Sequence, residues 1–246
     1  MNDLMEVRDV SVSFDGFKVI NDLNWSIGYP ELRALIGPNG AGKTTLMDII
    51  TGKTKADSGK VLWGQKAISL TQKSEYQIAK LGIGRKFQRP TIFEEQSVED
   101  NLMISLKNNR GFFSSLTYKY TDQEKLRVRE IAGTIKLRDF LPKKAGDLSH
   151  GQKQWLEIGM LLSQDPKLLL LDEPAAGMTT NERNMTVQLL RNLSKTKSII
   201  VVEHDMDFIR NLFCRVTVLH EGSVLAEGSI DHVSKNKEVV EVYLGR

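Results

Sequence analysis

The sequence predicts an α/β fold, and three observations support this prediction. Continuous apolar runs at residues 34–36, 168–171 and 199–202 are typical of strands buried on both faces of a parallel sheet. The first run leads through a glycine-rich turn into a helix start at Leu46. Mostly alternating apolar residues from Met5 to Phe14 predict a strand of an antiparallel part that precedes this core.

Length and composition limit the classes of protein to which the chain can belong. Its 246 residues can bury a full core and form one large domain, or one domain with a subdomain. The formal charge of +3 gives no electrostatic reason to expect a nucleic-acid partner. A single cysteine, Cys214, excludes an internal disulfide framework and suits a reducing compartment. Because residues 1–6 carry no signal pattern and no apolar run reaches roughly 18 residues, the chain is expected in the cytosol unless a partner holds it at a membrane.

The glycine-rich turn fits the pattern G-x-x-x-x-G-K-[ST] at every fixed position. The predicted phosphate-binding residues are Gly37, Pro38, Asn39, Gly40, Ala41, Gly42, Lys43, Thr44 and Thr45. Glycines let the backbone direct successive N–H groups toward an anion, and the helix start adds N–H groups and a partial positive charge. Lys43 can reach the outer phosphates of a nucleotide, and the Thr44 hydroxyl can ligate Mg²⁺. The alternative is a turn that binds nothing, and the lysine, the hydroxyl and the flanking elements together argue against it.

Two carboxylates end the leucine-rich strand at residues 168–171. Because the carboxyl ends of strands in open α/β sheets face the ligand crevice, Asp172 is placed to hold Mg²⁺ directly or through water. Glu173 is placed to orient and deprotonate a water molecule. The alternative for both is a solvated turn. His204, which follows the strand at residues 198–202, can contact a phosphate oxygen or position a water, although a lone histidine is more often structural.

The remaining pattern predicts further elements around this core. Strands are expected at residues 18–20 and 60–63, a helix at 74–81 capped by Ser74, a hairpin at 215–227, a short helix capped by Ser229 and an amphipathic helix at 237–244. The pattern is helical from residue 98 to 135, apart from a Gly-, Ser- and aromatic-rich stretch at 108–120 that predicts a loop. These features predict an α-helical subdomain of about residues 75–160, inserted into the α/β core.

Local pattern alone leaves three positions open. The Phe14 ring could stack on an adenine ring or pack in the core. Residues 149–152 form a second polar, glycine-bearing turn at a helix start, which is a plausible anion site, although a simple N-cap by Ser149 is the more common case. Gln88 follows a strand-like piece and precedes a proline break, and a lone glutamine is usually a surface residue.

Taken in order, these pieces resemble the ATPase subunit of ABC transporters, along essentially the whole chain and as a single domain of residues 1–246. Gly37–Thr44 matches the Walker A motif, Leu168–Asp172 matches Walker B, and Glu173 matches the catalytic carboxylate. The other matches are Gln88 to the Q-loop, Leu148–Gln152 to the signature motif, His204 to the switch histidine and Phe14 to the adenine-stacking aromatic.

The resemblance implies a P-loop NTPase core with an antiparallel β subdomain and a helical subdomain. It also implies that two such domains pack head to tail around two ATP molecules, each bound by the Walker A turn of one chain and the signature turn of the other. The residues expected to serve the partner's nucleotide are Ser149, Gly151 and Gln152. Glu173 is expected to activate water, with Lys43, Mg²⁺ and His204 stabilising the developing charge. The expected metal ligands are Thr44, Gln88 and Asp172.

The resemblance also implies the partners of the chain. They are transmembrane permease subunits at the cytoplasmic face of the membrane and a second ATPase chain, with a heterodimer expected and a homodimer possible. Residues 86–90, 175–178 and 242–245 look like the branched-chain amino acid importer type, whereas Ser149–Trp155 looks like the ATPase subunit of urea importers. Urea is therefore the expected cargo.

Other assignments remain as alternatives. The same subunit could serve branched-chain amino acids, short amides or lipopolysaccharide export. A soluble, non-transport ABC ATPase and a P-loop kinase are the rivals from other classes. Two side chains depart from the family pattern, because glycine is usual at the position of His150 and aspartate at that of Thr179. Both lie where coupling across the dimer is expected.

Overall fold

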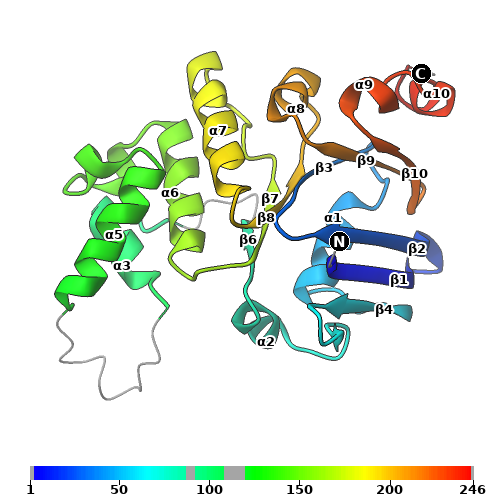
Figure 1. The fold of residues 1–246 in the computed structure, drawn as a ribbon, viewed down its shortest axis with the longest axis horizontal. Coiled ribbons are helices and arrows are strands. Elements are labelled where there is room, and N and C mark those ends of the chain that lie inside the picture. Colours follow the sequence, from blue (N-terminus) through cyan, green and yellow to red (C-terminus); the bar gives the residue numbers. More distant parts are fainter. Residues whose placement is uncertain (1–2, 87–91, 108–119, 245–246) are drawn as a thin grey trace.

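The computed structural model describes residues 3–86, 92–107 and 120–244, and its strands form two sheets (Figure 1). A four-stranded sheet has the order β2-β1-β4-β5, and a six-stranded sheet has the order β10-β9-β3-β8-β7-β6. The strands are β1 Asp3–Phe14, β2 Phe17–Gly28, β3 Leu32–Ile36, β4 Ser58–Trp63, β5 Ile68–Ser69, β6 Ile83–Lys86, β7 Leu168–Asp172, β8 Ser198–Val202, β9 Arg215–His220 and β10 Ser223–Gly228.

The four-stranded sheet is antiparallel throughout, which confirms the predicted antiparallel part ahead of the core. Strand β1 pairs with β2 on one side and with β4 on the other, so that Val7 lies opposite both Trp25 and Val61. These three side chains are buried, as the alternation of apolar residues predicts. One face of this sheet therefore packs into the core.

The six-stranded sheet contains the predicted parallel core. Strands β9, β3, β8, β7 and β6 run parallel to their neighbours, and β10 closes one edge antiparallel to β9. Every residue of β7 and β8 is buried, as expected for continuous apolar runs. Because Val202 at the end of β8 pairs with both Leu35 and Asp172, the segments that follow these three strands leave the same edge of the sheet.

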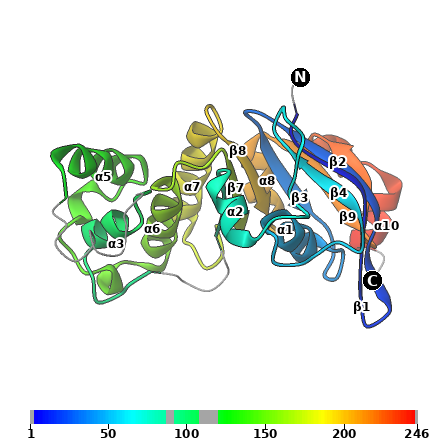
Figure 2. The ribbon, with the colours of Figure 1, turned by 90° about the horizontal axis from the view of Figure 1, so that it is seen from below.

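Helices cover both faces of the six-stranded sheet (Figures 1 and 2). The helices are α1 Lys43–Thr51, α2 Glu75–Lys80, α3 Val98–Ile104, α5 Asp122–Thr134, α6 His150–Leu162, α7 Thr180–Leu193, α8 Met206–Leu212, α9 Ile230–Val233 and α10 Lys237–Leu244, with short 3₁₀ turns at Arg138–Phe140 and Ala145–Asp147. Helix α1 packs in one hydrophobic cluster with Leu168 and Leu170 of β7, whereas α6 packs in another with Leu169 and Leu171. Alternate leucines of one strand thus serve two cores, one on each face.

Helices α3, α5 and α6 gather at the end of the molecule that lies to the left in Figure 1. This grouping lies after β6 in the chain. The sequence expectation placed the start of the helical subdomain near residue 75, but β6 pairs with β7, so residues 83–86 belong to the sheet. Most of the predicted loop at 108–120 falls outside the described residues.

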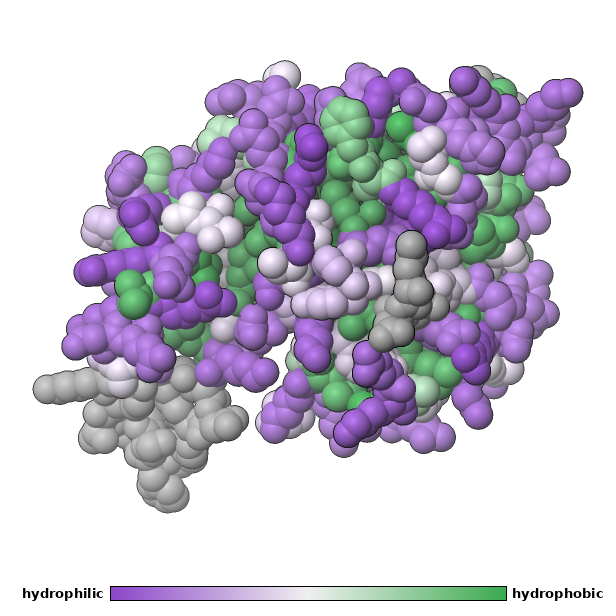
Figure 3. Space-filling view, in the orientation of Figure 1, coloured by the Kyte–Doolittle hydropathy of each residue, from purple (hydrophilic) through white to green (hydrophobic). Residues whose placement is uncertain are grey.

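The surface of the molecule is predominantly polar on the face shown in Figure 3, with hydrophobic residues in patches between hydrophilic ones. Over the described ranges, no helix is both long and apolar enough to cross a membrane.

A buried arginine joins the two sheets. Arg33 on β3 is 2% exposed, and its guanidinium forms ion pairs of 2.6 Å with both Glu31 and Glu227. Strand β2 of the other sheet contributes Trp25, whose ring centre lies 5.5 Å from the Arg33 guanidinium and whose indole N–H donates to the Thr217 hydroxyl at 3.0 Å. The two sheets are therefore fixed to each other by directional contacts as well as by apolar packing.

Candidate functional site

The glycine-rich turn connects β3 to α1, and its backbone conformation requires glycine at two positions. Gly42 has φ +97°, and a Cβ there would lie 2.6 Å from the Ile20 side chain. A Cβ at Gly37 would lie 2.2 Å from the Leu219 carbonyl oxygen. Over the described residues, no side chain caps the start of α1, so its first N–H groups face the turn as potential anion donors.

Lys43, the first residue of α1, lies over this turn. Its Nζ donates hydrogen bonds to the carbonyl oxygens of Gly37 at 2.7 Å and Pro38 at 2.9 Å. Burial lowers the pKa of Lys43, and the nearby carboxylates of Asp172 and Glu173 oppose this shift. The ammonium group is therefore held at the loop and next to two anionic groups.

The residues predicted for phosphate, metal and water chemistry meet around one cavity of about 320 Å³. It is lined by Val19, Gly37, Asn39, Gly40, Ala41, Gly42, Lys43, Thr44, Thr45, Asp172, Glu173, Val202, Glu203 and His204. The turn after β3 thus faces the ends of β7 and β8 across a shared space. This is the arrangement expected when parallel strands end at the same edge of a sheet.

The two carboxylates after β7 have different environments. Asp172 is 4% exposed, and burial raises its pKa, while nearby Arg85 opposes the shift. Glu173 is partly exposed, and its Oε1 lies 3.4 Å from Nδ1 of His204. An enclosed carboxylate suits metal binding, whereas an accessible carboxylate beside an imidazole suits proton transfer to and from water.

Glu203 is a site residue that the sequence reasoning left without a role. It lies between β8 and His204, is buried, and accepts hydrogen bonds from the backbone N–H groups of Ala175 at 3.1 Å and His204 at 3.2 Å. Burial raises its pKa. Glu203 therefore ties the turn that follows Glu173 to the end of the next strand. The feature of the sequence that could have identified Glu203 as a site residue is its position directly after a buried strand.

The signature turn lies elsewhere, at the start of α6. Ser149 and Gln152 form a capping box, in which the Ser149 hydroxyl accepts from the Gln152 N–H and the Gln152 side chain accepts from the Ser149 N–H. This confirms the N-cap. The Ser149 hydroxyl also donates to the Glu182 carboxylate at 2.8 Å, and a Cβ at Gly151 would lie 2.6 Å from the same carboxylate. Ser149, Gly151 and Gln152 do not line the cavity at the end of β3.

The two departures from the family pattern contact the same region. The His150 Nε2 lies 3.1 Å from the Ala176 carbonyl oxygen, in the turn after Glu173. Thr179 caps α7 and forms a capping box with Glu182. Through these contacts the start of α6 is joined to the segment that follows β7.

Besides the signature residues, three predicted residues are not placed at the cavity, and Pro38 is one of them, since it is absent from the cavity lining. Phe14 ends β1, is 47% exposed, and is not among the residues that line the cavity. Gln88 falls in residues 87–91, outside the described part of the chain. The described residues contain no group of three or more His, Cys, Asp and Glu side chains that could hold a metal by themselves.

Comparisons with known proteins agree with this geometry. Residues 20–176 match the sequence profile described as ABC transporter. The probable branched-chain amino acid transport ATP-binding protein LivG of Archaeoglobus fulgidus is 34% identical over 247 residues, which cover 98% of this chain and 95% of that protein. The high-affinity branched-chain amino acid transport ATP-binding protein LivG of Escherichia coli is 32% identical, with 98% of each chain covered. A solved ATP-binding cassette of an ABC transporter in its ADP conformation superposes with a TM-score of 0.87 at 30% identity and covers 100% of both chains.

Proposed function

The chain belongs to the ABC transporter family as an ATP-hydrolysing subunit, and we propose that it energises an importer of branched-chain amino acids. The observation that carries this proposal is the end-to-end similarity to two such transport proteins, at 34% and 32% identity. Urea, the cargo expected from the sequence, is the second candidate. It is favoured by the resemblance of Ser149–Trp155 to urea importers, and the relatives reported above do not support it.

The geometry of the cavity supports an assignment of roles in ATP hydrolysis. The backbone of the glycine-rich turn and Lys43 bind the phosphates of ATP, which replace the two carbonyl oxygens as acceptors for the Lys43 ammonium. Glu173 accepts the proton of the attacking water, because its carboxylate is accessible and lies 3.4 Å from His204 at the cavity. His204, beside Glu173, donates to a γ-phosphate oxygen and orients the water.

The side chains at the cavity fit a magnesium ion. Magnesium is usually held by one or two protein oxygens, with phosphate oxygens and water completing an octahedron. Asp172 and Thr44 both line the cavity beside the phosphate-binding turn and supply such oxygens. When bound, the ion would neutralise charge on the phosphates. We include Gln88 as a further ligand on the sequence resemblance alone.

In this proposal, the signature turn contacts the nucleotide that is bound by the partner ATPase chain. Ser149, Gly151 and Gln152 lie at a helix start but do not line the cavity of their own chain. A head-to-tail pair of ATPase domains would bring each signature turn to the partner's nucleotide. Importers of this type pair two different ATPase chains, so a heterodimer is the proposed assembly. Phe14, which is exposed and does not line the cavity, would stack on adenine.

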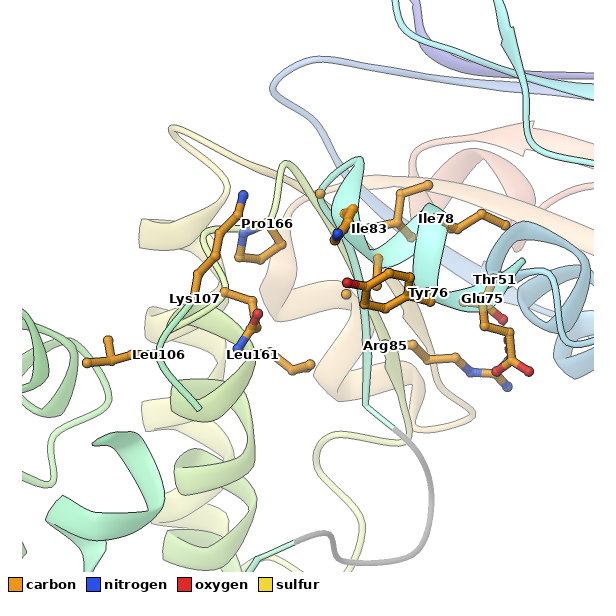
Figure 4. Close-up of a pocket in the computed structure, with 15 residues that line it drawn as sticks. Thr51, Glu75, Tyr76, Ile78, Ile83, Arg85, Leu106, Lys107, Leu161 and Pro166 are labelled. Atoms are coloured by element: carbon orange, nitrogen blue, oxygen red, sulfur yellow. Dashed lines mark hydrogen bonds between the residues drawn. The ribbon is translucent and has the colours of Figure 1, made fainter. Parts of the chain in front are cut away.

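The permease subunits would hold the chain at the cytoplasmic face of the membrane. A groove of about 590 Å³ lies between the sheet and the helical end of the molecule (Figure 4). Its walls come from α2, β6 and the end of α6, and Tyr76 on α2 is 66% exposed there. An amphipathic cytoplasmic segment of the permease suits a groove of this mixed polar and apolar lining. Tyr76→Arg should therefore release the chain from the permease in co-purification while ATP binding is retained.

Uptake of labelled substrates tests the function. Cells that lack this gene would be complemented with the wild-type gene or with Glu173→Gln, and uptake of labelled leucine and labelled urea would be measured in parallel. If the variant loses leucine uptake and the wild-type gene restores it, the proposal is supported. If the variant loses urea uptake but keeps leucine uptake, the cargo is reassigned to urea. If neither changed while the variant was expressed and bound ATP, the importer function would be refuted for both cargoes.

A further inference from the structure

The last two residues of β6 contact helices on opposite faces of the sheet. Successive side chains of a strand point to opposite sides, and Arg85 and Lys86 follow this rule. Arg85 pairs with Asp48 on α1 and lies 3.4 Å from the Thr51 hydroxyl on the same helix. Figure 4 shows the Arg85 side chain extending from β6 toward Thr51.

Lys86 makes the corresponding contact on the other face. Its Nζ lies 3.3 Å from a carboxylate oxygen of Glu157, at the middle of α6. Both side chains of this pair are 3% exposed. Loss of one partner from a buried ion pair is strongly destabilising, and such pairs hold a defined geometry when both partners are present. This pair is therefore a directional link between β6 and α6.

The two helices that β6 links begin at the two candidate phosphate-binding turns. Helix α1 begins at Lys43, and α6 begins directly after Ser149. They belong to different hydrophobic clusters, on opposite faces of the sheet. Their mutual orientation is therefore transmitted through the sheet rather than through one shared core, and β6 contacts both by charged groups.

Surface recesses border these links. The groove of about 590 Å³ lies against Arg85, and a second recess of about 190 Å³ is lined by both Lys86 and Glu157. The apolar side of α6 packs against β7 in a hydrophobic cluster, so the charged contacts add directional restraint on the side of β6.

We propose that Arg85 and Lys86 are positioning residues, which hold α1 and α6 in the mutual orientation that ATP hydrolysis requires. The inference rests on the proposed function, because the turn at the start of α1 serves the chain's own nucleotide and the turn at the start of α6 serves the partner's. A change in the angle between these helices would leave each turn intact. It would prevent both composite sites of a head-to-tail pair from closing together.

The test compares three forms of the buried pair in the transporter assembled with its permease and partner ATPase. The apolar form is Lys86→Met with Glu157→Leu, which removes both charges of the pair together. The swapped form is Lys86→Glu with Glu157→Lys. A control applies the same apolar change to an exposed pair in the helical end of the molecule, Lys144→Met with Glu95→Leu, where the charges lie 3.0 Å apart at the surface.

The readouts are the Kd of ATP for the isolated chain and the kcat of the assembled transporter. The apolar form should bind ATP within about twofold of wild type and lose at least about tenfold in kcat, because a misplacement of catalytic groups by about 1 Å can cost about 100-fold in rate. The swapped form should recover most of this loss, and the control should match wild type. Should the apolar form fail to fold, Lys86→Gln with Glu157→Gln, which also removes both charges together, carries the same comparison.

Wild-type kcat in the apolar form, or equal loss in the apolar and swapped forms, would overturn the positioning role. A parallel loss of ATP binding and kcat would overturn it too, since that is the signature of general destabilisation. Failure of the proposed function is a separate outcome, in which the wild-type assembly itself shows no ATP turnover.

Discussion

Replacement of Glu173 by glutamine should abolish ATP turnover and leave ATP binding and folding nearly unchanged. The substitution preserves the shape of the side chain and removes its capacity to accept a proton. A positioned general base contributes about 100- to 10,000-fold to a rate, equivalent to about 2.7–5.4 kcal/mol of activation free energy. The side chain is partly exposed and lies 3.4 Å from His204, itself largely exposed, so its loss should cost at most about 0.5 kcal/mol of stability.

The assay is single-turnover hydrolysis of ATP by the assembled transporter, with Kd for ATP measured in parallel. Glu221→Gln is a matched control, because Glu221 is also an exposed glutamate with φ +47° and lies outside the cavity. The variant should lose at least about 100-fold in rate, and the control should keep the wild-type rate. A loss below about tenfold in Glu173→Gln would refute the role of Glu173 as the base and would direct attention to His204.

Three further changes have distinct expected outcomes. Gly151→Ala should lower ATP turnover at least about tenfold, because its Cβ would lie 2.6 Å from the Glu182 carboxylate that accepts a hydrogen bond from Ser149. Gly133→Ala is the control and should leave ATP turnover unchanged, because its Cβ would lie 3.6 Å from the nearest atom. Burial raises the pKa of the Cys214 thiol to about 11 from 9.0, so iodoacetamide at pH 8 should label the native chain about 100-fold more slowly than the unfolded chain; equal rates would contradict this. Burial also raises the pKa of Asp172, so the folded state loses stability as pH rises from 3.8 through that raised pKa. Asp172→Asn should therefore gain unfolding free energy relative to wild type as pH rises over this window. Urea titrations in which the difference in unfolding free energy between the two proteins does not change with pH would contradict this.

Signals that act within a few residues were sufficient to predict much of the fold. Ser74 and Ser229 were predicted to cap helices, and a cap was one of two interpretations of Ser149; each of the three accepts a hydrogen bond from the N–H three residues later. The apolar runs of β7 and β8 were equally clear, because both faces of these strands are buried. Residues that follow the carboxyl ends of such strands face one edge of the sheet, which is why Asp172 and His204 could each be proposed as site residues from the sequence.

Contacts between distant segments could not be predicted in the same way. Arg85 and Asp48 are 37 residues apart in the sequence, and Glu203 accepts from a backbone N–H 28 residues earlier. From the sequence, each of these charged side chains is expected at the surface. Its burial can be inferred only when the position of its partner in the fold is known. In the proposed transporter the cargo would contact other subunits, so residues of this chain do not identify it.

The backbone at Glu173 has a consequence for how this chain can evolve. Its φ of +47° is a conformation that a residue with a side chain adopts at a cost of about 1–3 kcal/mol, and it persists here because the Glu173 N–H donates to the Val202 carbonyl at 2.9 Å. Glycine would relieve that strain. A population of variants selected for heat resistance alone should therefore accumulate glycine at this position and lose ATP turnover as it does so. Retention of glutamate in living cells would then record selection for turnover against selection for a more durable fold.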